Sequence, residues 1–278
     1  MRKRIRSLIA TLPLMVLPAI AQTPPPRAPA RQAAAKQVST QGIPRAADGK
    51  PNFNGIWQSM NTANWDLEDH SAQAGPLVAA GAIGAEPAGL GIIEGSSTIP
   101  YKPEALKKRD ENFKNRAKED PEFKCYLPGV PRANYMPYPF QIVQSTGDML
   151  FTYAYDNAAR VVLMTKHRDA ELDTWMGTSN GRWDGDTLVI DVTGFNGRAW
   201  LDRAGNFSSD SLHVVERYSM LDANTINYEA TLEDSDAYTK PWKISFPLYR
   251  HREKNARLLH FQCVEFVEET LYGDLTRK

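Results

Sequence analysis

Residues 212–233 read LHVVERYSMLDANTINYEATLE, and the fold class follows from this segment. Apolar and polar side chains alternate over residues 212–220 and again over 225–232, with the period of two that is typical of β-strands. The four residues between them, Leu-Asp-Ala-Asn, suit a turn. The segment therefore predicts an antiparallel hairpin.

The chain after Phe140 continues with short strand-like segments that are separated by turn residues. Asp184-Gly185-Asp186 contains the Asp-Gly pair that a type I′ hairpin turn requires. Expected strands cover residues 141–145, 149–155, 160–165, 182–183, 187–193, 212–220, 225–232, 242–249 and 258–267. Sequential strands without crossover helices predict an antiparallel meander, which closes into a barrel or a sandwich. We therefore expect a mainly β fold with one or two short helices and a long Gly-rich loop.

The first strand of the hairpin carries a charge on each face. Glu216 and Arg217 point to opposite sides, so one of them is drawn toward the interior or its rim. A buried charge needs a partner, and the register places Arg217 opposite either Glu229 or Tyr228. A structural ion pair is one interpretation. The other is a catalytic Glu216, with Arg217 and Tyr228 as ligand contacts.

Two segments precede the strands. Residues 103–118 predict a helix, because Pro103 suits a first turn and Glu104 complements the positive end of the helix dipole. Its few apolar residues indicate that it covers a surface rather than filling a core. Residues 71–100 are rich in Gly and Ala and have no period, which leaves either a flap over a site or a plain insertion.

The N-terminus has the pattern of a secretory signal peptide over residues 1–21. A basic start and a short apolar run precede Ala19-Ile20-Ala21, and the run is too short for a membrane anchor. Residues 22–47 are rich in Pro, Ala and Gln and predict a disordered linker. Residues 48–278 then form a single domain. We expect a periplasmic or secreted protein without stable membrane insertion after cleavage.

Charge and motif content exclude several classes of partner. The 33 basic and 33 acidic residues balance, which argues against nucleic acid and anionic lipid as partners. The histidines lack metal-ligand spacing, and no Gly-rich phosphate loop opens a helix, so we expect no metal and no cofactor. Residues 177–181 match the G-x-S-x-G motif, but a hairpin follows where a helix is required, so Ser179 is an accidental match.

The chain contains two cysteines, Cys125 and Cys263. In an oxidising compartment an isolated pair of this kind predicts one disulfide, and two unpaired buried thiols are the alternative.

Two local groups are candidates for a site. Asp66 and His70 could serve in ligand binding and in acid–base catalysis, or form a solvated acidic turn. Arg132, Tyr135 and Tyr138 stand among prolines that rigidify residues 125–140.

An Arg beside aromatic walls suits a carboxylate or enolate on an apolar ligand, so Arg132 joins His70 and Glu216 as a catalytic candidate. Covering of a barrel end is the alternative for this segment. Trp175 is a further candidate for ligand contact.

Seven short motifs stand along the chain: DGKP at 48–51, GIW at 55–57, IPY at 99–101, CYLPGVPR at 125–132, WMG at 175–177, GRWDGDTLVID at 181–191 and HVVERY at 213–218. Together they resemble a widespread group of uncharacterised exported bacterial proteins, and that resemblance supplies no catalytic residues. The GIW motif is also similar to the G-x-W signature of lipocalins, which implies a lipocalin-like (calycin-type) barrel whose Trp closes the floor.

Three functions fit these observations. A barrel that encloses an apolar or aromatic small molecule could be a cofactor-independent lyase, isomerase or hydrolase. It could instead be a non-catalytic ligand carrier. A scaffold protein of the cell envelope is the third hypothesis, and it calls for a large exposed apolar patch.

Overall fold

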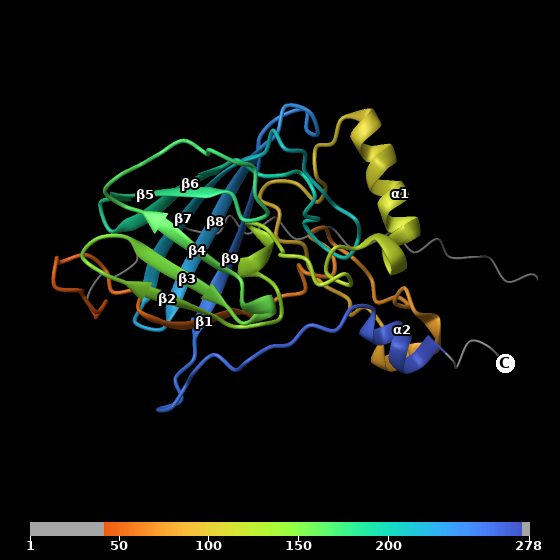
Figure 1. Cartoon of the computed structure of the whole chain (residues 1–278), viewed down its shortest axis with the longest axis horizontal. Coiled ribbons are helices and arrows are strands. Elements are labelled where there is room, and N and C mark those ends of the chain that lie inside the picture. The colour runs from red at the N-terminus through yellow and green to blue at the C-terminus, as the bar shows by residue number, and fades with distance from the viewer. Residues whose placement is uncertain (1–41, 274–278) are drawn as a thin grey trace, which may run out of the picture. The chain divides into compact units, whose positions relative to one another are not determined.

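The computed structural model describes residues 42–273 and consists mainly of β-strands (Figure 1). The predicted signal peptide and the predicted linker as far as residue 41 lie outside the described residues. Nine strands form one closed barrel. They are β1 (Gly55–Ser59), β2 (Phe140–Gln144), β3 (Met149–Tyr153), β4 (Ala159–Leu163), β5 (Thr178–Asp184), β6 (Thr187–Thr193), β7 (His213–Asp222), β8 (Thr225–Glu233) and β9 (Trp242–Arg250).

Neighbouring strands of the barrel pair in chain order, and β9 closes the ring on β1. Every pair is antiparallel except β4·β5, which is parallel and joined by a crossover segment, residues 164–177. We call the junction of β4 and β5 the β4·β5 seam. Two pairs of opposing residues join the strands there, Val162↔Ser179 and Leu163↔Asn180. The predicted mainly β barrel is confirmed, but a purely antiparallel meander is wrong at this seam.

The predicted strand over residues 258–267 is also wrong. Residues 251–266 contain no strand, and α2 (Val267–Tyr272) follows them. The physical reason is closure of the barrel: once β9 pairs with β1, no free edge remains for another strand to join.

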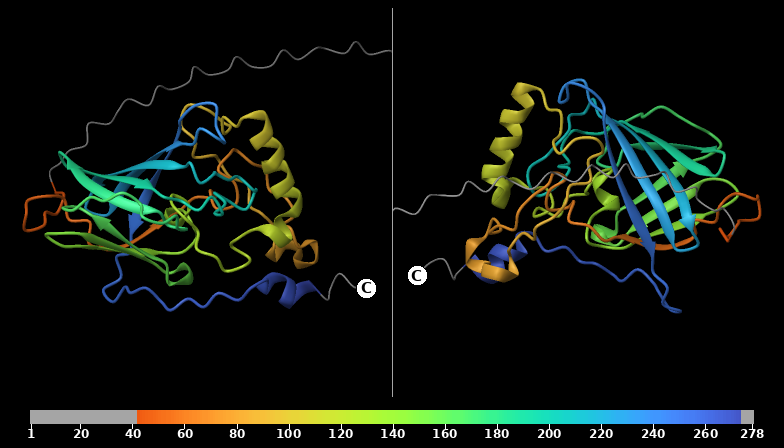
Figure 2. Two further views of the ribbon diagram at one scale, coloured as in Figure 1. Left: turned by 45° about the horizontal axis from the view of Figure 1, so that its top comes forward. Right: turned by 180° about the vertical axis from the view of Figure 1, so that it is seen from behind.

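The two α-helices of the described chain lie outside the barrel, on the same side of it (Figure 2). The helix expected over 103–118 is confirmed as α1 (Pro103–Glu119), which has Pro103 in its first turn and Glu104 beside the helix start. Leu106 is 46% exposed, in keeping with a helix that covers a surface. The short helices are η1 (Val78–Ile83), η2 (Arg132–Asn134) and η3 (Tyr155–Asn157).

The last residues of the predicted disordered linker, 43–47, already belong to the fold. Ile43 is buried, and Arg45 forms an ion pair of 2.6 Å with Asp186 in the β5–β6 turn. The GIW tryptophan, Trp57, is fully buried, and the guanidinium of Arg250 lies 4.1 Å from the centre of its ring. No helix within residues 42–273 has the length and apolar character needed to cross a bilayer.

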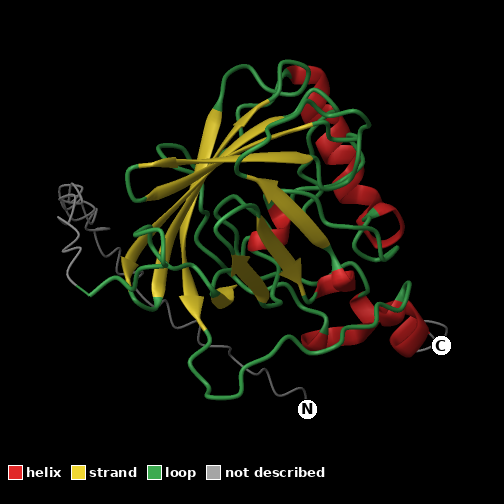
Figure 3. Ribbon diagram, turned by 60° about the vertical axis from the view of Figure 1, so that its left-hand side comes forward, coloured by secondary structure: helices red, strands yellow, loops and turns green. Residues whose placement is uncertain are grey.

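The interior of the barrel is filled rather than hollow. Alternate residues of β7 and β8 point inward and are buried, as the period of two predicts. Loop segments occupy the space that the strands surround (Figure 3). One of them, which we call the plug, is residues 126–137; Val130, Arg132 and Asn134 in it are each at most 2% exposed.

Candidate ligand-binding site

An ion pair lies at the centre of the barrel. In β4, Ala159 and Val161 are exposed while Arg160 and Val162 are buried, so the strand alternation turns an Arg inward. Arg160 Nη1 lies 2.6 Å from Glu216 Oε2, and Nη2 donates to Oε1 at 3.1 Å. Both side chains are at most 2% exposed. This bidentate pair gives each charge a partner in a place where neither could remain alone.

Hydroxyl and amide groups complete this ion pair. Tyr218, Tyr228 and Asn134 each donate to Glu216 Oε1, at 2.9 Å in every case. Arg160 Nε donates to the hydroxyl of Tyr153 at 3.1 Å. Burial raises the pKa of Tyr153 to about 12, so its phenol stays protonated at neutral pH.

The guanidinium stays charged in this environment. Burial lowers the pKa of Arg160, but the charge of Glu216, its hydrogen bond and the neighbouring Tyr153 and Tyr218 together outweigh burial and place the pKa well above its ordinary value. The centre of the barrel is therefore a satisfied polar network, and its carboxylate is enclosed by donors.

A cavity of about 470 Å³, which we call the lateral pocket, opens at the β4·β5 seam. β4 and β5 pair with each other only from Val162 and Ser179 onward. Residues 159–161 and 174–178, which precede this first pair, line the pocket. Most of its wall is apolar, and two of its lining residues are both polar and buried. The wall residues are Leu127, Leu163, Leu172, Trp175 and Met176.

We call Arg160 and Ser179, the polar lining residues that are buried, the floor of the lateral pocket; both are at most 5% exposed. Arg160 Nη1 donates to the hydroxyl of Ser179 at 3.4 Å, which is long for a hydrogen bond. The other donors of the guanidinium go to Glu216, Tyr153 and Tyr218 at 2.6–3.1 Å. The contact to Ser179 is therefore the weakest hydrogen bond that the Arg160 guanidinium donates, and both of its residues line the lateral pocket.

The rim of the lateral pocket carries charges of both signs. Arg168, Asp169 and Glu171 are exposed residues of the crossover segment. The side chain of Arg168 has no acidic partner within the described part of the chain. Because Glu216 neutralises Arg160, the net charge of the pocket is that of its rim, where one Arg stands against two carboxylates.

A glycine shapes the wall beside the floor. Gly177 has φ +67°, and a Cβ at this position would lie 2.8 Å from Cγ1 of Val192. The left-handed backbone and the close packing both require glycine here. The crossover segment can therefore turn directly from Trp175 into β5 and bring the indole to the pocket.

Arg132 lies in the plug, and each nitrogen of its guanidinium contacts an acidic or amide oxygen. Its Nη2 lies 2.6 Å from Glu122 Oε2, its Nη1 3.5 Å from Asp120 Oδ1, and its Nε donates to Asn64 at 2.9 Å. Glu122 also pairs with Arg203 at 2.7 Å. These contacts fix the plug in the barrel end, which is the covering role considered for this segment.

The carboxyl groups around Arg132 differ in their acidity. Burial alone would raise the pKa of Glu122, but the charges of Arg203 and Arg132 outweigh it and lower the pKa to about 2. For Asp120, burial prevails over the attraction of Arg132 and raises the pKa to about 6. Glu122 is therefore the main anionic partner of the two guanidinium groups.

His70 and Asp66 lie in the loops outside the barrel. His70 Nδ1 lies 2.8 Å from the carbonyl oxygen of Glu68, and its backbone pairs with Gly89. Asp66 accepts from Asn206 at 3.2 Å, and burial raises the pKa of its carboxyl. His70, Arg132 and Glu216 thus belong to three separate sets of contacts and do not form one site.

The predicted ligand contacts also separate. Trp175 lines the lateral pocket, and Tyr228 belongs to the network around Glu216. Tyr135, a residue of the plug, donates to the carbonyl of Leu201 at 2.7 Å.

Two more predicted ligand contacts lie away from the lateral pocket. Arg217 faces outward opposite Glu229, as one of the two registers predicted, and pairs with Asp184 at 2.9 Å. Tyr138 lies near the C-terminal segment.

Sequence reasoning missed Arg160 and dismissed Ser179. A signal for Arg160 exists, because it is a single Arg in the apolar strand Ala159–Leu163 and shares a face with Val162. Ser179 lies in β5 rather than at a strand-to-helix turn, so the nucleophile elbow is absent, yet Ser179 lines the lateral pocket. The predicted disulfide between Cys125 and Cys263 is confirmed.

Within the described residues, no group of three or more His, Cys, Asp or Glu side chains is placed to hold a metal ion. Comparisons with protein-family models and with curated proteins find no match for the chain.

Proposed function

We propose that this protein binds a small, uncharged apolar or aromatic molecule in the lateral pocket, as a non-catalytic ligand carrier. The observation that carries the proposal is the pairing of an apolar wall around Trp175 with a buried polar floor at Arg160 and Ser179. A concave apolar site with a few fixed polar groups is the usual form of a small-molecule site.

The floor defines the polar group of the ligand. A carbonyl or hydroxyl oxygen would take the Arg160 donor that now makes a long contact to Ser179. A full negative charge is less well matched, because Glu216 already neutralises the guanidinium. The ligand is therefore an aromatic or aliphatic ring system with one acceptor oxygen, small enough for a space of about 470 Å³.

The same geometry favours a carrier over a cofactor-independent enzyme. Acid–base catalysis needs a titratable group within reach of the ligand. Glu216 accepts hydrogen bonds from three neutral donors in addition to Arg160, and the carboxylates that line the pocket, Asp169 and Glu171, are exposed at its rim. His70 and Arg132 have their own partners elsewhere.

The experiment is recovery of a ligand by mass spectrometry after the purified protein is incubated with an extract of aromatic metabolites. Ala159→Trp places a large ring in the pocket from an exposed position of β4, and Val143→Trp on β2 is the matched control outside it. We expect the wild type and the control to retain the same molecule and Ala159→Trp to lose it. Retention of nothing, or equal retention by Ala159→Trp, would refute the proposal.

The proposed place of action is the periplasm or the extracellular space. The signal-peptide pattern of residues 1–21 and the Cys125–Cys263 disulfide support it. Fractionation of cells that express the full chain tests this location, and a product confined to the cytoplasm with reduced cysteines would contradict it.

A further inference from the structure

The chain leaves the barrel after β9 and runs along its outside to α2 (Figure 1). We call residues 251–266 the strap. It begins where the amide of His251 donates to the carbonyl of Ile56 at 2.8 Å, and it ends where Phe266 N donates to the carbonyl of Phe123, also at 2.8 Å. The strap has no strand partner, so its attachment depends on these ends and on side chains between them.

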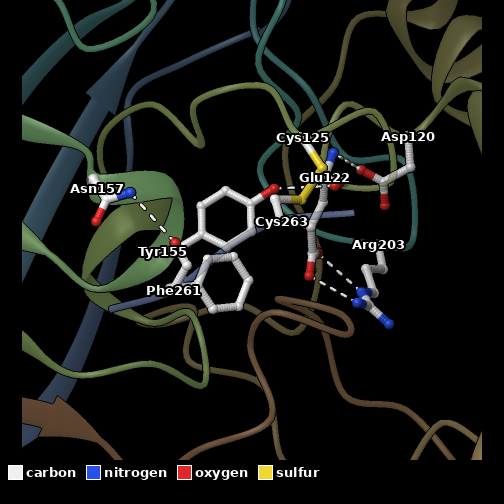
Figure 4. Close-up of a disulfide and its surroundings, with 8 residues drawn as sticks. All are labelled: Asp120, Glu122, Cys125, Tyr155, Asn157, Arg203, Phe261 and Cys263. Carbon is white, nitrogen blue, oxygen red and sulfur yellow. Dashed lines mark hydrogen bonds and ion pairs between the residues drawn. A yellow bond between two sulfur atoms is a disulfide. The ribbon is translucent and has the colours of Figure 1, made fainter. Parts of the chain in front are cut away.

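An aromatic group and a disulfide fix the middle of the strap (Figure 4). The ring of Phe261 packs against those of Tyr138 and Tyr155, with ring centres 4.8 and 5.3 Å away, and the two tyrosine rings also contact each other. Two residues later, Cys263 is bonded to Cys125. The strap is thus held at a defined place against the barrel.

Between the strap and the barrel lies a cavity of about 570 Å³. The barrel side contributes the apolar residues Ile56, Pro139 and Ala154 together with the ring of Tyr138. The strap side contributes the aromatic ring of Phe261 and several polar side chains. One wall of this strap cavity is therefore apolar and aromatic, and it is separate from the residues of the lateral pocket.

The strap side of the cavity carries one Arg, one Glu and two His residues. Arg257 has no acidic partner within residues 42–273. Among the other titratable residues that line the cavity, His251 faces Glu253 at 3.6 Å, and His260 has no ion pair in the described chain. The single carboxylate thus lies beside a histidine, while the guanidinium of Arg257 is free for an anion.

We propose that the strap cavity is a second ligand site, which takes an aromatic carboxylate. The ring of the ligand would pack on Tyr138 and Phe261, and its carboxylate would meet Arg257, with His260 as a further donor. The Cys125–Cys263 bond holds the outer wall of this site in place. The inference is independent of the lateral pocket, since the two cavities share no lining residue.

The test uses the oxidised full chain and hydrogen–deuterium exchange with mass spectrometry, which reports on each site separately. The probe is 2-naphthoate, and the matched uncharged compound is 2-naphthylmethanol. We expect 2-naphthoate to protect residues 251–261 and 2-naphthylmethanol to protect them less. Arg257→Gln should raise the 2-naphthoate concentration that gives half-maximal protection about fivefold. Arg252 is an exposed neighbour that does not line the cavity, and Arg252→Gln should leave this concentration unchanged.

A Cys125→Ser/Cys263→Ser variant should lose the protection of the strap while any ligand effect at residues 168–179 persists. The inference is overturned if 2-naphthoate gives no protection of residues 251–261, if both probes protect them equally, or if Arg257→Gln and Arg252→Gln behave alike. Protection at residues 168–179 alone would also overturn it, and would leave the proposed function of the lateral pocket standing.

Discussion

Arg160 on β4 and Glu216 on β7 form a bidentate ion pair inside the barrel, with 2.6 Å between Nη1 and Oε2. Strand alternation turns both side chains inward, and the surrounding hydroxyl and amide groups satisfy them. Because this network occupies the centre, the available space lies at the wall, where the short β4·β5 seam leaves the lateral pocket.

Removal of one charge from this pair should destabilise the fold. We expect Glu216→Gln to lower the free energy of unfolding by about 3–5 kcal/mol, because it leaves the buried guanidinium of Arg160 without its counter-ion. Chemical denaturation followed by tryptophan fluorescence measures the loss. Adding Arg160→Met to the variant removes the unpaired charge, so part of the lost stability should return.

The matched control for that prediction is the next residue of the same strand. Arg217 faces outward and pairs with Asp184 at the surface, so Arg217→Met should change the free energy of unfolding much less. Equal effects of Glu216→Gln and Arg217→Met would show that the buried pair has no special part in stability.

The ion pair between Glu122 and Arg132 of the plug should make the stability of the fold depend on pH. Its pKa in the folded chain lies below the ordinary value of 4.5, at about 2. The carboxylate therefore stabilises the fold above pH of about 4.5, and this contribution is lost as the pH falls toward 2. A shift of this size corresponds to about 3 kcal/mol.

We expect Glu122→Gln to be less stable than the wild type at pH 7 and the difference between the two to narrow from pH of about 4.5 down to 2. Denaturation at a series of pH values measures it. Glu119→Gln, which removes an exposed partner of Lys124, serves as the control. A difference between wild type and Glu122→Gln that stays constant with pH would count against the assignment.

Gly177→Ala should destabilise the fold through both backbone strain and contact. The left-handed φ costs about 1–2 kcal/mol for a residue with a Cβ, and the new atom lies too close to Val192. Gly185→Ala isolates the first cost, since Gly185 has φ +59° but open space around it. Thermal unfolding should rank Gly177→Ala below Gly185→Ala, and the reverse order would contradict the packing described at the pocket.

Loss of the disulfide should lower stability. The closed loop spans 138 residues, and chain entropy sets an upper figure of about 5 kcal/mol for its contribution. Cys125→Ser/Cys263→Ser is expected to unfold at a lower denaturant concentration than the oxidised wild type. Addition of a thiol reductant should lower the midpoint of the wild type and leave that of the double variant where it is.

The barrel was predictable because its signals are local. A period of two and short turns such as Asp184-Gly185-Asp186 specify hairpins one at a time. The seam was not predictable in this way, since a parallel pair such as Val162↔Ser179 depends on where a crossover segment returns. Residues 258–267 have the composition of a strand but find no free edge.

The candidate site was harder to predict because its contacts are distant in sequence. A buried Glu216 predicts a positively charged partner, but that partner is Arg160, which lies 56 residues away in the sequence. Arg132 has the residue type of a ligand anchor, yet Glu122 and Asp120 already engage it. Trp175 is the predicted ligand contact that does line the lateral pocket, and nothing in its local sequence separates it from the other tryptophans.

The most direct test of the lateral pocket is the dissociation constant of the retained molecule, measured by isothermal titration calorimetry for the wild type, Trp175→Ala and Trp183→Ala. Trp183 packs against Phe53 and does not line the pocket. We predict a loss of affinity of about tenfold or more for Trp175→Ala, since removal of a buried ring contact costs more than about 1 kcal/mol, and unchanged affinity for Trp183→Ala. Unchanged affinity in Trp175→Ala would contradict binding at this pocket.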